Sequence, residues 1–161
     1  MSDRPKLYQA GIRDVKFGDE VRVIEPVNLY ECEISNNCFI GPFVEIQRGV
    51  RIGESTKIQS HTFICELVSI GSNCFIGHGV MFVNDRFNTG KPAGGDQSKW
   101  ENTIINDHVY IGSNVTLLPV TICEHVVIGA GSVVTRDIDK PGIYAGNPAR
   151  FIRSNPSNLI K

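Results

Sequence analysis

Four polar residues of types that support proton transfer occur within twenty residues of one another. His78 stands between two glycines, Asn84 and Asp85 follow it, and Glu66 precedes Asn84 by eighteen residues. An imidazole accepts a proton near neutral pH, and carboxylates and amides hydrogen-bond to amines and hydroxyls. These residue types suit a reaction in which a nucleophile is oriented and loses a proton. The elements that carry them decide whether they meet.

Those elements are defined by an apolar residue that recurs every six residues, with a shorter step at two places. These positions are Phe17, Val23, Leu29, Ile34, Ile40, Ile46, Ile52, Ile58, Ile64, Ile70, Ile76, Phe82, Ile105, Ile111, Leu117, Ile122, Ile128 and Val134. Six is not a helical period and β-branched residues are frequent, so each hexad predicts a short strand and a corner. Three hexads make one triangular coil. The sequence therefore predicts an all-β parallel β-helix, a prism of about six coils stacked about 4.8 Å apart.

The place of a residue within its hexad predicts its role. The fourth position holds residues that tolerate positive φ and predict left-handed corners, namely Asn37, Gly49, Asn73, Gly79, Asp85, Asn114, Gly131 and Asp137. His61, His108 and His125 share that position, which favours a structural role for them. His78, by contrast, occupies the third position, where the side chain should point outward. Glu66 and Asn84 also occupy the third position, so they should stack on one face a coil apart.

Two segments interrupt the repeat and set the expected organisation of one domain over residues 1–161. An N-terminal extension (1–16) precedes coils over 17–139, and a cap or tail (140–161) follows them. The coils are interrupted by a loop over 85–103 that is rich in Gly, Pro and charge. A long loop inside a compact repeat is more often functional than not. Asp85 could hold this loop, accept from a substrate amine, or serve as a corner residue.

Composition restricts the class of protein. The chain has 161 residues and a formal net charge of -1, with Lys and Arg scattered along it. This argues against nucleic acid or an anionic membrane as the main partner. No stretch approaches the roughly 20 apolar residues of a membrane span, so we expect a soluble cytoplasmic protein. The five cysteines form no CxxC pair, and Cys38 and Cys74 are expected in the core.

The C-terminal segments resemble a known superfamily. Ile128-Gly129-Ala130-Gly131-Ser132-Val133-Val134, followed by Tyr144-Ala145-Gly146-Asn147-Pro148-Ala149-Arg150, is similar to the C-terminal signature of hexapeptide-repeat acyltransferases, which nearly the whole chain resembles. Ile76-Gly77-His78-Gly79-Val80-Met81-Phe82-Val83-Asn84-Asp85 resembles one branch, bacterial N-acetyltransferases of nucleotide-linked 3-amino sugars for O-antigen or S-layer glycans. The resemblance implies a left-handed β-helix, an acetyl-CoA donor with no metal, and a homotrimer with sites between neighbouring prisms. The run Leu117-Leu118-Pro119-Val120-Thr121-Ile122 departs from the superfamily pattern because no Gly follows the Pro.

By the same resemblance, Asn84 orients the acceptor amine, and either His78 or the departing thiolate takes its proton. Substrate contacts are expected from Glu66, Asp85, Arg86 and Trp100. Trp100 and Phe87 could stack on the acceptor's base or pin the loop to a neighbouring subunit. Donor contacts are expected from Ser113, Ala130, Gly131, Arg136, Arg150 and Arg153.

Three alternatives remain open from the sequence. A sugar O-acetyltransferase would need a true base for its hydroxyl nucleophile. A zinc enzyme resembling γ-carbonic anhydrases would carry a second His five residues after His78, where this chain has Val83. A non-catalytic scaffold would not need a Gly-rich loop beside an outward Glu–Asn column. No phosphate-binding GxxxxGK[ST] or dinucleotide GxGxxG motif is present.

Overall fold

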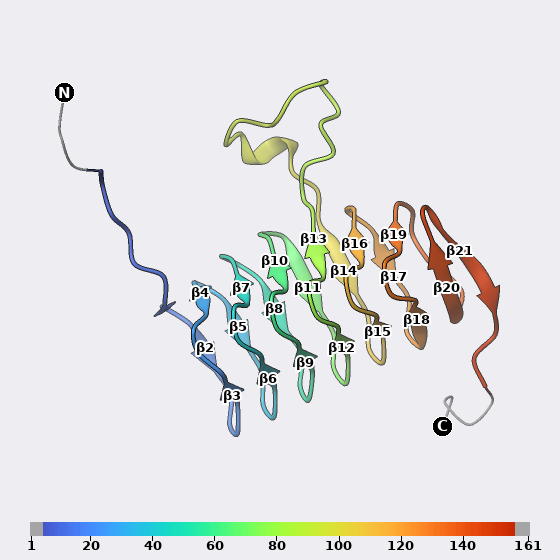
Figure 1. The fold of residues 1–161 in the computed structure, drawn as a ribbon, viewed down its shortest axis with the longest axis horizontal. Helices are drawn as coiled ribbons and strands as arrows, with labels where there is room; N and C mark the ends of the chain where they lie inside the picture. The colour runs from blue at the N-terminus through green and yellow to red at the C-terminus, as the bar shows by residue number, and fades with distance from the viewer. Residues whose placement is uncertain (1–4, 157–161) are drawn as a thin grey trace.

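The computed structural model describes residues 5–156, which wind into a prism with three parallel sheets as its walls (Figure 1). Sheet A contains β1 (Ile12–Arg13), β4 (Asn28–Tyr30), β7 (Glu45–Ile46), β10 (Phe63–Ile64), β13 (Met81–Phe82), β16 (Thr116–Leu117) and β19 (Val133–Val134). Sheet B contains β2 (Lys16–Phe17), β5 (Glu33–Ile34), β8 (Arg51–Ile52), β11 (Val68–Ile70), β14 (Thr103–Ile105) and β17 (Thr121–Ile122). Sheet C contains β3 (Arg22–Val23), β6 (Phe39–Ile40), β9 (Lys57–Ile58), β12 (Phe75–Ile76), β15 (Tyr110–Ile111), β18 (Val126–Ile128), β20 (Gly142–Gly146) and β21 (Ala149–Arg153).

Each strand of the coils pairs in parallel with the equivalent strand of the next coil, whereas the last strand, β21, pairs antiparallel with β20. In sheet C, for example, Ile58 lies opposite Ile40 on one side and opposite Ile76 on the other. The six-residue spacing therefore stacks identical positions, and the all-β, left-handed parallel β-helix is confirmed. The stacked apolar residues form one continuous core, in which Ile40, Ile58 and Ile76 are fully buried.

The prism is longer at both ends than the repeat spacing indicates. It begins with β1, which pairs with β4, and it ends with β20, which pairs with β18. Phe17 is 41% exposed and Val23 is half-buried, because their coil lies at the N-terminal end with little packed over it. At the other end Tyr144 and Ala149 pack against the core.

The corners carry the left-handed residues that the fourth position predicts. Positive φ occurs at Asn37, Gly49, Asn73, Gly79, Asn114 and Gly131, and also at His61, His108 and His125. The prediction is wrong for Asp85 and Asp137, which are not among the positive-φ residues. Both carboxylates instead accept backbone hydrogen bonds, Asp137 from the Thr121 N–H at 2.8 Å and Asp85 from its own loop.

Cysteines occupy interior positions, as expected for Cys38 and Cys74. Thr56 lies between these two in the column, and its hydroxyl accepts a hydrogen bond from the Cys74 N–H at 3.0 Å. Burial raises the pKa of the Cys65 thiol to about 12, and that of Cys32 and Cys74 to about 11. These thiols are free and belong to the core.

A loop over 83–102 leaves the prism between β13 and β14, and it holds a short 3₁₀ helix, η1 (Gln97–Lys99) (Figure 1). Thr103, expected in this loop, instead starts β14, where it pairs with Val68 of β11. The coil thus continues after the loop in the register it had before. No helix in the described part of the chain is long and apolar enough to cross a bilayer.

Candidate functional site

The predicted site residues lie on two different corners of the prism. Strands of sheet A lead into sheet B at the A–B corner, where Arg48, Glu66, Asn84 and Pro119 follow one another coil by coil. Strands of sheet C lead into sheet A at the C–A corner, where Ser60, His78, Ser113 and Ala130 follow one another.

At the A–B corner the predicted Glu66–Asn84 stack is present. Asn84 Nδ2 donates to the backbone carbonyl of Glu66 at 3.4 Å. The Glu66 carboxylate is already paired, because Arg48 Nη2 lies 3.1 Å from each of its oxygens. The stack therefore presents a half-buried amide beside a neutralised carboxylate.

Asp85 holds the loop at the point where the chain leaves the coil. One carboxylate oxygen accepts the Phe87 N–H at 2.8 Å, and the other accepts the Ala93 N–H at 2.7 Å. Both acceptors are thus engaged with loop backbone. Of the three roles left open for this residue, the geometry favours holding the loop.

The two ends of the loop are tied together by Arg86 and Glu101. Arg86 Nε lies 3.1 Å from a Glu101 carboxylate oxygen, and its guanidinium also donates to the carbonyl of Pro119 in the next coil. The Glu101 N–H donates to the carbonyl of Asn84 at 2.9 Å. Arg86 therefore fixes the base of the loop against the prism.

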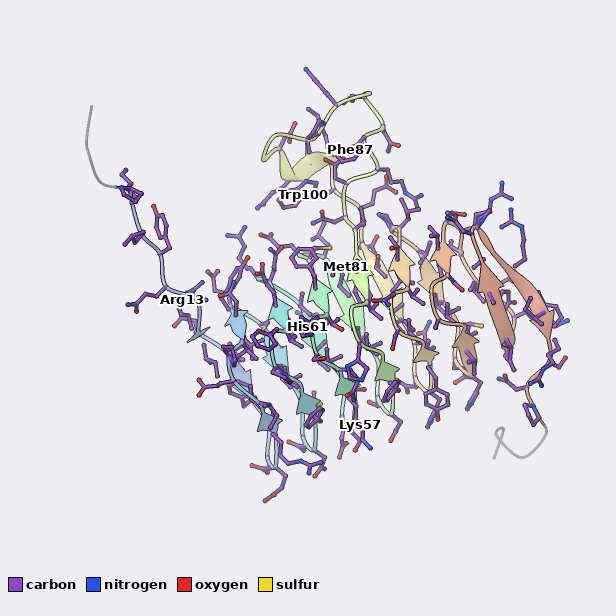
Figure 2. The ribbon with its side chains drawn as sticks, viewed as in Figure 1. Arg13, Lys57, His61, Met81, Phe87 and Trp100 are labelled. Atoms are coloured by element: carbon purple, nitrogen blue, oxygen red, sulfur yellow. The ribbon has the colours of Figure 1, made fainter. Side chains whose placement is uncertain are left out.

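The loop encloses a cavity of about 230 Å³, and its lining includes Asp85, Lys91, Ala93, Lys99 and Trp100. Trp100 is half-buried there, whereas Phe87 is 55% exposed on the outer part of the loop (Figure 2). Lys99 is paired with Asp96 at 3.1 Å. The indole of Trp100 and the ammonium group of Lys91 beside one hollow can contact an aromatic ring and an anion.

At the C–A corner His78 is exposed and its ring is oriented by a neighbour. Ser60 Oγ lies 2.9 Å from His78 Nδ1. When Nδ1–H donates to this hydroxyl, Nε2 carries the lone pair that a base needs. In that tautomer the exposed imidazole can accept a proton from outside the prism.

Small residues continue this corner from His78 toward the C-terminal end. The Asn114 N–H donates to the carbonyl of His78 at 2.8 Å, and the Gly131 N–H donates to the carbonyl of Ser113 at 2.9 Å. A Cβ on Gly131 would have no atom within 4 Å. The predicted donor residues Ser113, Ala130 and Gly131 therefore line one open corner.

The predicted arginines are not gathered in one place. Arg150 pairs with Ala145 of β20, and the Ala145 side chain lies over Gly129, so Arg150 is near the end of the C–A corner. Arg153 lies farther along β21, opposite Ile143, and Arg136 follows β19 at the A–B corner. All three are exposed.

The structure separates the two predicted catalytic residues within one chain. His78 precedes β13 and Asn84 follows it, so they lie on different corners, with about 20 Å of extended chain between them. A site that uses both side chains on one substrate has to combine His78 of one copy with Asn84 of another.

Sequence reasoning missed Ser60 as the partner of His78. The signal was available, because Ser60 precedes His78 by eighteen residues, the spacing that linked Glu66 to Asn84. Within residues 5–156, no group of three His, Cys, Asp or Glu side chains is placed to hold a metal ion.

Comparisons with known proteins agree with this geometry. Residues 31–66 match the family described as bacterial transferase hexapeptide (six repeats). Residues 67–81 and 102–136 match the hexapeptide repeat of succinyl-transferase, and the gap between them falls on the loop. The bifunctional protein GlmU of Carboxydothermus hydrogenoformans is 37% identical over 152 residues, which are 93% of this chain and 31% of that protein. The chain spans about a third of the length of such curated relatives.

Two solved structures extend the comparison. A hexapeptide-repeat acetyltransferase from Vibrio cholerae, complexed with acetyl coenzyme A, is 27% identical with a TM-score of 0.62, over 73% of this chain and 67% of that one. A polysialic-acid-specific acetyltransferase, NeuO, is 25% identical with a TM-score of 0.57, over 88% of this chain and 70% of that one.

Proposed function

The chain belongs to the hexapeptide-repeat transferases, and we propose that it transfers an acetyl group from acetyl-CoA to the amine of a nucleotide-linked 3-amino sugar. The observation that carries the proposal is the C–A corner. There His78 is oriented by Ser60, and the coils after it present a row of small residues, Ser113, Ala130 and Gly131, which we call the lane of small residues. Pantetheine is narrow and carries amide groups, so a lane of small side chains and exposed backbone suits it. The similar Vibrio cholerae protein binds acetyl-CoA.

The acceptor lies on the other side of His78, covered by the loop of an adjacent copy. In this arrangement Asn84 of one copy and His78 of the next face the same substrate, which a homotrimer with sites between prisms provides. Asn84 Nδ2 makes only a long hydrogen bond of 3.4 Å, so its amide is available to orient the amine. Trp100 and Lys91 of the loop cavity contact the nucleotide.

The reaction is direct attack of the neutral amine on the thioester carbonyl. The new C–N bond forms as the C–S bond breaks, and coenzyme A leaves as a thiolate. The amine proton passes to His78 Nε2 or to that thiolate. Arg150, near the end of the same corner, contacts a donor phosphate. We place this enzyme in the cytoplasm, where nucleotide sugars for surface glycans are made.

The test is release of coenzyme A against a panel of nucleotide-linked 3-amino and 4-amino sugars, with sugars lacking the amine as controls. We expect turnover with a 3-amino sugar. Activity on hydroxyl acceptors alone would contradict the choice of an amine. If no coenzyme A ester raised the melting temperature, acyl transfer itself would be contradicted.

Sugar O-acetylation is the second candidate, and the Ser60–His78 hydrogen bond is the observation that favours it. A hydroxyl needs a base far more than an amine does. His78→Ala should therefore lower kcat by less than about 10-fold with an amine acceptor, and by about 10²- to 10⁴-fold with a hydroxyl acceptor. His108→Asn, which changes a histidine on another corner but keeps a residue suited to positive φ, serves as the control.

A further inference from the structure

The C–A corner differs sharply on the two sides of His78. Toward the C-terminal end its outward residues are small, among them Gly79, Ser113 and Gly131. Toward the N-terminal end they are two aromatic rings, Phe43 and His61. From this asymmetry we infer that Phe43 and His61 form a stacking surface for the nucleobase of the acceptor; the inference rests on the proposed function.

The two rings already form a stack. Their centroids are 4.8 Å apart and their planes differ by 28°. Phe43 is 57% exposed, so much of its ring is open to solvent. Every nucleobase has a flat π-face, and stacking on aromatic side chains is a common way to bind one. A ready-made ring pair at an open corner suits such a ligand.

The backbone at Phe43 has a conformation that bulky residues rarely adopt. Phe43 has φ of 59° and His61 has φ of 62°. Gly and Asn adopt this left-handed region easily and His does so often, but a bulky residue there is an outlier. Other corners have Asn at the same position, for example Asn37 and Asn73, and Leu67 is the other bulky apolar residue of the coils with positive φ there. A strained phenylalanine whose ring stays exposed is better explained by contact with another molecule.

A hollow beside Phe43 extends the surface. Its volume is about 250 Å³, and its lining includes Pro26, Val27, Asn28 and Val44. Oδ1 of Asn28 is buried and has no hydrogen-bond partner among residues 5–156. A base brings ring N–H donors as well as an apolar face, so it could satisfy an acceptor that the chain leaves free.

The spacing along the corner fits a nucleotide-linked sugar. The coil of Phe43 lies two coils from that of His78, or about 9.6 Å away. A ribose and a diphosphate separate the base of such a substrate from its sugar. The base and the reacting sugar therefore have to be held at separate places, with the acceptor on the aromatic side of His78 and the donor on the small-residue side.

The experiment compares Phe43→Asn and His61→Asn with the wild-type full chain. Asn suits the left-handed backbone, so each variant removes a ring without disturbing the coil. His108→Asn is the matched control, because it removes one ring of the stacked His108–His125 pair at a left-handed position on another corner. Binding of free uridine and thymidine diphosphates is measured by calorimetry. Steady-state kinetics give KM for the acceptor and for acetyl-CoA.

We expect Phe43→Asn to weaken nucleotide binding and raise the acceptor KM by about 5- to 100-fold, the range seen when one stacking partner is lost. The KM for acetyl-CoA, the oligomeric mass and all constants of His108→Asn should be unchanged. Unaltered nucleotide binding in Phe43→Asn, or no nucleotide binding by the wild type, would overturn the inference. So would a changed oligomeric mass, since the ring would then pack between copies. The proposed function has its own test, and it is contradicted if coenzyme A is not released from acetyl-CoA in the presence of any acceptor.

Discussion

Ser60 Oγ and His78 Nδ1 lie 2.9 Å apart at equivalent positions of successive coils. In the proposed reaction the hydroxyl would act through the ring rather than on the substrate, because it contacts Nδ1 and leaves Nε2 free. We therefore propose Ser60 as a positioning residue for a base, in the way that a third group orients the imidazole in other acid–base sites.

Ser60→Ala removes that hydrogen bond and lets the His78 ring rotate. One hydrogen bond of about 1 kcal/mol corresponds to about a 5-fold loss in kcat, and the KM for acetyl-CoA should not change. Initial-rate kinetics check this, with Ser72→Ala, at the equivalent position of the B–C corner, as the control. Equal kinetics for Ser60→Ala and the wild type would show that the His78 ring needs no anchor.

Asp85→Ala should loosen the loop without disturbing the core. The change removes the acceptors of the Phe87 and Ala93 N–H groups, while the neighbouring strands keep their pairing. We expect faster proteolysis within residues 86–96, a higher KM for the acceptor and little change in melting temperature. Limited proteolysis with mass spectrometry checks this, and Asp137→Ala, which removes an acceptor of a backbone N–H outside the loop, is the control. A large drop in melting temperature would contradict the assignment of Asp85 to the loop alone.

The buried thiols predict a loss of stability at high pH. In the unfolded chain a cysteine releases its proton near pH 8.5, whereas burial raises the pKa of Cys65 in the fold to about 12 and that of Cys32 and Cys74 to about 11. Above pH 8.5 the unfolded state therefore binds fewer protons than the folded state. The contribution of these thiols to the free energy of unfolding is therefore complete below about pH 8.5, and it decreases as the pH rises toward 11.

Urea unfolding between pH 7.5 and pH 10.5 measures this fall. Cys65→Ala should reduce the dependence of the unfolding free energy on pH, although its stability at pH 7.5 is lower because of the cavity. A Cys65→Ala profile parallel to that of the wild type would contradict a protonated thiol at this position. Cys123, which is half-buried and near the surface, provides the comparison through Cys123→Ala.

The fold could be predicted from the sequence because one repeated constraint governs it. Every coil has to place an apolar residue inside and form left-handed corners. The residue types seen at Ile58 and at Asn73 therefore recur at equivalent positions of other coils, and each recurrence supports the same prediction. The prediction was wrong for Asp85, which has the residue type of a corner but begins the loop. Phe17 takes its predicted place opposite Ile34 but is 41% exposed, because it lies in a terminal coil.

The candidate site was predictable only in part. The spacing of eighteen residues placed Glu66 and Asn84 together, and the six residues between His78 and Asn84 imply successive corners, a consequence that the sequence-based assignment of both to one site did not take into account. Contacts made by the long side chains could not be predicted from the sequence spacing either. The pairing of Arg48 with Glu66 and of Arg86 with Glu101 depends on side-chain reach, for which the repeat holds no signal.

The prism continues after the loop in the register it had before, with Thr103 beside Val68 and Ile105 beside Ile70. The inserted segment is therefore a module that the scaffold carries at no structural cost to its walls. Under the proposed function, exchanging it for a segment of different length and composition is expected to change the acceptor while the small residues of the C–A corner still bind the donor. Substrate choice could then change through substitutions confined to one stretch of chain.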